Sequence, residues 1–183
     1  ELVDQLAAYM LSFKENPIQA KSVAEGLQEH LDLYFDDEFW AEIQELITGT
    51  NTKGFEYLYA YKNADDRLAF KCADSLGVVE VRANDMDNNC QYIIYWYVDR
   101  VGEDKKQIKK IRVYDADQIY FYAQIDDGSI VLDNSQELNP RPNVVWKDDK
   151  TGTMYGDSLG FVPFWRLDNN EKQFNGLKSI KGL

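Results

Sequence analysis

The side chains that could do chemistry are few, and none stands beside a suitable partner. His30 is the only histidine among the 183 residues, so catalysis by a Ser–His or Cys–His pair would need it, yet it falls on the polar face of an expected helix. Neighbouring aspartates could supply the two carboxylates of a glycosidase. They occur at Asp36-Asp37, Asp65-Asp66, Asp126-Asp127 and Asp148-Asp149. Each pair falls at an expected helix cap or turn, where aspartate bonds to the backbone, so we predict no catalytic residues.

Two spacings imitate ligand-binding loops. The first places polar residues at alternate positions, at Asp85, Asp87 and Asn89. A calcium loop needs glycine at its sixth position and a bidentate glutamate at its twelfth, but Cys90 and Trp96 stand there. The second is a glycine at every fourth position, at Gly152, Gly156 and Gly160. No Lys-Ser/Thr follows, as a phosphate loop requires, so we predict neither a metal site nor a cofactor site.

One aromatic row could bind a ligand. Residues 54–62 alternate, and the period of two in a strand gathers four rings on one face. These are Phe55, Tyr57, Tyr59 and Tyr61. Such a row could stack bases or sugars, but no Lys/Arg stripe accompanies it. We therefore favour packing of the row under helices, with a small-ligand or carbohydrate-binding β-domain as the alternative function.

Composition narrows the class of protein. A chain of this length holds one domain, or one domain with an appendage. Its formal net charge of −12 repels phosphate backbones, so tight, sequence-independent nucleic-acid binding is not expected. Cys72 and Cys90 are predicted to be buried free thiols in a reducing compartment. No apolar run approaches the roughly 18 residues of a membrane span, and no signal peptide is visible. Helical patterns at both chain ends predict a fragment of a longer protein.

Helical periodicity predicts three helices before the first strand, at 1–13, 23–34 and 38–48. Asn16-Pro17 is expected to end the first helix, because proline disfavours the helical conformation of the residue before it. Ser22–Glu25 reads as a capping box for the second. Asp36 or Asp37 is expected to cap the third, and Gly49 to end it.

From Gly54 the period changes to two, which predicts one antiparallel sheet between residues 54 and 132. Its expected strands are 54–62, 67–73, 78–82, 90–100, 107–114, 118–125 and 129–132. Pro163 makes 160–167 an edge strand, and the polar segments 83–89 and 147–158 are expected to be the least ordered loops. The fold class is therefore α+β, with N-terminal helices packed on a mainly antiparallel sheet. We expect a helical part at 1–49, a β-rich domain at 50–167 and the start of another helix at 168–183.

Short motifs in a fixed order add a more specific interpretation. The helical part carries Asp4-Gln5, Tyr9-Met10-Leu11 and Asn16-Pro17-Ile18. The strands carry Lys53–Tyr61, Leu68–Phe70, Asp74-Ser75-Leu76, Val79 and Val81. The last part carries Gly160–Phe164, Asn169-Asn170 and Leu177–Leu183. Taken together, over essentially the whole chain, they resemble the wing region of portal proteins from long-tailed bacteriophages of Gram-positive bacteria. The stretches 83–110 and 133–158 depart from that pattern.

The resemblance implies a structural protein and not an enzyme. Portal proteins form a ring, usually of twelve subunits, at one capsid vertex of the virion, and are made in the cytoplasm of the bacterial host. The ring passes double-stranded DNA during packaging and ejection, and it meets the large terminase subunit, the scaffold or major capsid protein and the head–tail connector proteins. ATP hydrolysis belongs to the terminase, so the resemblance carries over no catalytic residue and no cofactor, and no membrane partner is expected. The stem that packs subunits together would follow Leu183.

Overall fold

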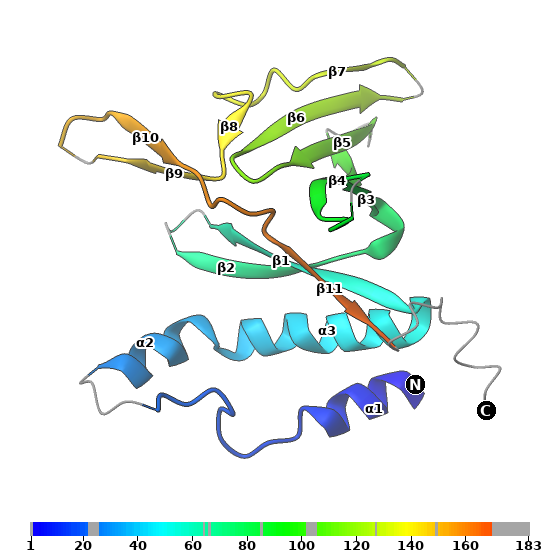
Figure 1. The fold of residues 1–183 in the computed structure, drawn as a ribbon, viewed down its shortest axis with the longest axis vertical. Coiled ribbons are helices and arrows are strands. Elements are labelled where there is room, and N and C mark those ends of the chain that lie inside the picture. Colours follow the sequence, from blue (N-terminus) through cyan, green and yellow to red (C-terminus); the bar gives the residue numbers. More distant parts are fainter. Residues whose placement is uncertain are drawn as a thin grey trace. The chain divides into compact units, whose positions relative to one another are not determined.

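The computed structural model describes residues 2–21, 26–63, 65, 67–84, 86–101, 106–126, 128–148 and 150–169. These residues form two compact units (Figure 1). The first unit comprises residues 2–75 together with 165–169, and the second comprises residues 76–164. Helices lie in the first unit and antiparallel strands occur in both, so the expected α+β class is confirmed. The expected helical segment 168–183 lies outside the described residues from position 170 onward.

The helices of the first unit are α1 (Leu2–Met10), α2 (Leu27–Tyr34) and α3 (Asp37–Lys53). Helix α1 ends before the expected residue 13, where the Ser12 hydroxyl donates to the Tyr9 carbonyl. Gly26, with φ of 78°, immediately precedes α2. The expected capping box at 22–25 lies outside the described residues.

Helix α3 begins where the sequence predicted and ends later. The Asp36 carboxylate accepts a hydrogen bond from the Phe39 amide at 3.0 Å, which satisfies one of the free amides of the first turn. Gly54 ends the helix, with φ of 97° and its amide bonded to the Thr50 carbonyl at 2.8 Å. The expected stop at Gly49 is therefore wrong. Gly49 lies inside the helix, where an added Cβ would overlap the Glu56 side chain.

The sheet of the first unit contains β1 (Phe55–Lys62), β2 (Leu68–Ala73) and β11 (Phe164–Asp168), in the order β11-β1-β2. Strand β11 is the expected edge strand, shortened so that Pro163 precedes it. Helix α3 lies between α1 and the β1–β2 pair (Figure 1). Phe39 of α3 packs edge-on against Phe70 with ring centroids 5.1 Å apart, and Phe70 pairs with Ala60 across the strands. The helix therefore covers the face that carries Ala60.

The aromatic row of β1 lies on the opposite face, so its expected packing under the helices is wrong. Glu56, Leu58 and Ala60 share the helix-covered face, because residues two apart in a strand point the same way. Tyr57 and Tyr59 are nevertheless buried, with 3% and 8% of their surface exposed. The period-two pattern located the row correctly, but it could not say which face the helices would cover.

The second unit is built on a six-stranded antiparallel sheet with the path β3-β4-β5-β6-β7, to which β8 pairs beside β6. The strands are β3 (Val78–Arg82), β4 (Cys90–Val101), β5 (Lys106–Tyr114), β6 (Gln118–Ile125), β7 (Ile130–Leu132) and β8 (Arg141–Pro142). The short 3₁₀ helix Ser75–Gly77 precedes β3. The expected single sheet from 54 to 132 is thus wrong, because β1 and β2 pair with β11 and not with this sheet.

A hairpin follows the six-stranded sheet, formed by β9 (Val144–Lys147) and β10 (Met154–Asp157). The expected loop at 147–158 is therefore wrong at both of its ends. The Asp148 carboxylate accepts bonds from the amides of Lys150 and Thr151 at 2.7 and 3.2 Å, which folds the tight turn between the strands. The other expected loop, 83–89, does connect two strands, and its greater mobility stays a prediction.

Candidate functional site: a cationic cluster and an open sheet face

The residues singled out for chemistry lie on helix α2 and at caps and turns. His30 is exposed on α2, Asp36 caps α3, Asp126 occupies a turn with φ of 50°, and Asp148 folds the hairpin turn. Asp37 is the first residue of α3 and Asp65 lies in a turn, while Asp66, Asp127 and Asp149 lie outside the described residues. Among the residues that the structure describes, no three His, Cys, Asp or Glu side chains gather as metal ligands would.

The two spacings that imitate ligand loops are split between different elements. Asp85 lies outside the described residues, while Cys90 and Trp96 belong to β4, so twelve consecutive residues do not form one loop there. Gly152 and Gly160 adopt φ of 70°. Gly156 lies within β10, where an added Cβ would overlap the Pro142 ring. These glycines permit turns and close packing, and strand β10 rather than a helix follows Gly152.

Glu56 is a buried carboxylate that the sequence analysis did not single out. Only 1% of the residue is exposed, and its carboxylate accepts a hydrogen bond from the Ser75 amide and forms an ion pair with Lys53. Burial raises the pKa of Glu56, although both partners act against that rise. Burial works to lower the pKa of Lys53, but its hydrogen bonds to Asp74 and Glu56 raise it overall. The group ties α3, β1 and the 74–75 turn together, which is a structural role.

The two cysteines are half-buried and unpaired. Burial, followed by the charges of Glu56, Glu45 and Glu42, raises the pKa of Cys72 to about 12. Because the thiolate is the reactive form of cysteine, this thiol is chemically quiet at neutral pH. The thiols are free but half-buried, where full burial was expected, and the reducing compartment stays a prediction.

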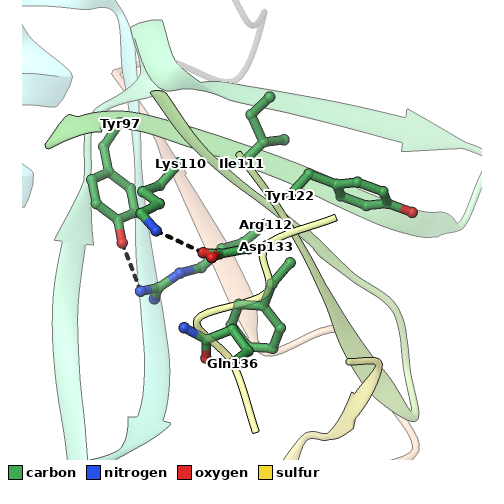
Figure 2. Close-up of a pocket in the computed structure, with 8 residues that line it drawn as sticks. Tyr97, Lys110, Ile111, Arg112, Tyr122, Asp133 and Gln136 are labelled. Carbon is green, nitrogen blue, oxygen red and sulfur yellow. Dashed lines mark hydrogen bonds and ion pairs between the residues drawn. The ribbon is translucent and has the colours of Figure 1, made fainter. Parts of the chain in front are cut away.

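A cationic cluster lies on the buried face of the six-stranded sheet (Figure 2). Lys110 of β5 donates to the Asp133 carboxylate at 2.7 Å, and Arg112 donates to the Tyr97 hydroxyl at 2.7 Å. Both cations stand on the same face as Tyr97, because Tyr97 pairs with Lys110 across the strands. Arg141 of β8 places its guanidinium over the Phe121 ring, 5.0 Å from the centroid. The cluster thereby holds the segment after β7 against the sheet.

Electrostatics in this cluster favour a structural role. Burial works to raise the pKa of Asp133, but hydrogen bonds from Lys110 and Ser135 lower it overall. Burial, followed by the positive charge of Arg112, lowers the pKa of Arg141. The cavity that Lys110, Arg112 and Asp133 help to line measures about 30 Å³, which is room for one or two waters. A substrate does not fit there.

The opposite face of the same sheet is open and apolar. Register and period two place large apolar side chains there from all five strands of the main path. We call this the open sheet face, and its most exposed members are Val79, Tyr92, Trp96, Val98, Ile130 and Leu132. Val98 and Leu132 expose 47% and 54% of their surface. An exposed apolar patch of this kind is typical of interaction surfaces.

The charges on the open sheet face are of one sign. Lys109 of β5 lies there with its ammonium 5.0 Å from the centroid of the Trp96 ring, an arrangement that attracts a cation to the aromatic face. Arg100 lies on the same face at the end of β4, two residues beyond Val98. Among the described positions of this face there is no carboxylate. The face is thus apolar with a basic border, although the whole chain is acidic.

The described helices include none that is both long enough and apolar enough to cross a membrane. In a comparison with protein families, residues 1–183 match the family described as phage portal protein, SPP1 Gp6-like. A search among curated proteins returns no match.

Proposed function

Since the chain belongs to the phage portal protein family of the SPP1 Gp6-like type, we propose that it forms the wing of a subunit in the ring through which DNA enters and leaves the capsid. The family assigns a structural role in the virion, within an oligomeric ring at the portal vertex. The match over all 183 residues is the observation that carries this proposal. In this proposal, helices α1 to α3 and the sheets as far as Asp168 of β11 form the wing, and the chain after Asn169 leads towards the stem.

The finer roles that we propose follow from this place in the ring. The large terminase subunit docks on the ring during packaging, the scaffold or major capsid protein surrounds it, and head–tail connector proteins bind after the head is full. Subunits are made in the bacterial cytoplasm and remain in the virion. Double-stranded DNA passes the ring without tight binding by this region, which the net charge of −12 favours because like charges repel.

The alternative function, a small-ligand or carbohydrate-binding β-domain, would use an aromatic surface that is largely buried in this structure. A carbohydrate-binding β-domain would need the aromatic row of β1 open to solvent, but Tyr57 and Tyr59 are buried. Trp96, an exposed ring of the second unit, has the Lys109 ammonium over its face and otherwise shares the open sheet face with exposed apolar side chains such as Val98. An apolar face of this kind suits a protein partner better.

The proposal is tested by deleting the gene in the phage or prophage that carries it and restoring the complete gene product from a plasmid. We expect deletion to abolish heads with DNase-protected DNA and expression to restore them. The purified complete product should form rings in electron micrographs. A normal yield of DNA-filled heads without the gene would overturn the proposal.

A further inference from the structure

Helix α1 presents a second apolar surface, in the first unit. It packs on α3 through a side that includes Ala7, which is fully buried. The neighbouring side of α1 consists of large apolar residues that remain exposed, namely Leu2, Leu6, Tyr9 and Met10. Leu2 and Tyr9 expose 83% and 79% of their surface. We call this side the α1 stripe, and it is as unusual for a soluble helix as the open sheet face is for a sheet.

The α1 stripe and the open sheet face are complementary in shape. A helix stripe and an apolar sheet face bury one another in the common two-layer architectures of protein domains. The α1 stripe is one helix wide, and the open sheet face presents Trp96 and Val98 on its long strand β4 between the apolar residues of β3 and β7. Within the part of the chain that the structure describes, both surfaces are exposed, and each could supply a covering layer for the other.

Their charge surroundings also match. Residues 1–49 contain eleven carboxylates and two lysines, a net charge of −9 within the total of −12. The open sheet face has Lys109 and Arg100 at its border and no carboxylate among its described positions. Opposite net charges of two regions steer their surfaces together and discourage like surfaces from pairing. A sheet face meeting a second sheet face would bring two basic borders together.

We propose that the α1 stripe of one subunit packs on the open sheet face of the next subunit around the ring. The inference rests on the ring assembly proposed above and names its contact. A ring closes through heterologous contacts, in which two different patches of the chain meet head to tail, and these two patches satisfy that requirement. The occupant of the open sheet face is therefore a second copy of this chain.

Disulfide trapping on the complete gene product tests this contact. In a background with Cys72→Ala and Cys90→Ser, Leu6→Cys is placed on the α1 stripe and Val98→Cys on the open sheet face. Both residues are exposed, so the substitutions leave the cores intact. The chain with both cysteines is expected to give a ladder of reducible oligomers under mild oxidation. An equal mixture of the two single-cysteine chains is expected to stop at dimers, because each chain then has one reactive patch.

A matched control replaces Val98→Cys by Met86→Cys, since Met86 is fully exposed outside both surfaces. Paired with Leu6→Cys, it is expected to give at least tenfold less cross-linked product. Cross-links within one chain would show that α1 covers its own sheet, and dimers of the Val98→Cys chain alone would show sheet-to-sheet pairing; either result overturns the inference. Rings that form in micrographs without any cross-link would overturn it while leaving the proposed function standing, whereas absence of rings would count against the proposed function itself.

Discussion

At the scale of single residues, the most constrained group is the carboxylate of Glu56. It lies on the helix-covered face of β1, where the neighbouring positions are Leu58 and Ala60, and it bonds to the Ser75 amide and Lys53. A buried polar group needs such partners, because an unpaired one costs about 1–3 kcal/mol. Gly49 supplies the space that the carboxylate occupies. This set of contacts explains why a glycine is tolerated inside α3.

The raised pKa of Glu56 predicts a pH dependence of stability. A carboxyl group whose pKa is higher in the folded state stabilises the fold below its unfolded pKa, and that contribution is lost as the pH rises through the folded value. Glutamine resembles the protonated form and does not titrate. The free energy of unfolding of Glu56→Gln, relative to that of the unaltered protein, should therefore increase as the pH rises from 4 to 7. Urea unfolding at both pH values measures the difference. Glu38→Gln, at an exposed position of α3, is the comparison variant. An equal trend in both variants would contradict the prediction.

At the scale of elements, helix α3 organises the first unit. It contacts α1 on one side and both β1 and β2 on the other. Its aromatic and carboxylate side chains hold the strands in place. The Glu42 carboxylate, for example, accepts hydrogen bonds from the Lys71 ammonium at 2.5 Å and from the Cys72 amide at 2.7 Å. Its two ends are set by Asp36 and Gly54. The chain can turn from α3 into β1 because Gly54 adopts a left-handed conformation, which glycine reaches without the steric penalty of a Cβ.

Gly54→Ala should therefore destabilise the protein by about 1–2 kcal/mol, the penalty of a left-handed L-residue. Chemical denaturation with circular dichroism detection measures the change. Thr52→Ala, two residues earlier at an exposed helical position, is the control and should be neutral or slightly stabilising, since alanine is the better helix former. Equal stability of Gly54→Ala and the unaltered protein would show that the cap relaxes freely.

At the scale of the whole molecule, the distribution of apolar surface indicates assembly. The second unit buries one face of its sheet around Ile93, Tyr114 and Phe121, and leaves the other face open. The first unit leaves the α1 stripe open. A portal subunit in a ring needs such surfaces, whereas a solitary domain of this size would place polar residues there.

Residues 1–183 alone are expected to be a monomer or a weak oligomer, because obligate rings often bury more than about 2,000 Å² per contact and the family's stem helices would supply much of that area. Light scattering after size exclusion at micromolar concentration measures the mass. Any association that does occur should weaken with Leu6→Asp and persist with the control Met86→Asp. A stable closed ring from residues 1–183 would show that the wing suffices for assembly.

The sequence determined the class and the local elements. Period two located strands β3 to β7 to within about one residue, as at Val78–Arg82 and Gln118–Ile125, because alternation of apolar residues follows directly from strand geometry. Strands β8, β9 and β10 were not predicted. Local capping chemistry narrowed the cap of α3 to Asp36 or Asp37, of which the structure selects Asp36, and the order of short motifs identified the family. Turn and cap aspartates were recognised for the same reason: their hydrogen bonds reach only two or three residues along the chain.

The tertiary structure decided which strands pair and which faces are covered. Nothing in residues 54–73 reveals that β1 would pair with β11 rather than continue the later sheet, because strand pairing depends on contacts over a hundred residues apart, such as the Asn169 amide with the Gly54 carbonyl at 2.9 Å. The covered side of β1 depends on where α3 packs, so the role of Glu56 was invisible in a pattern that treats it as polar and outward. The open sheet face was hidden for the same physical reason: period two shows that a strand has two apolar faces, but only packing shows that one of them is left for a partner.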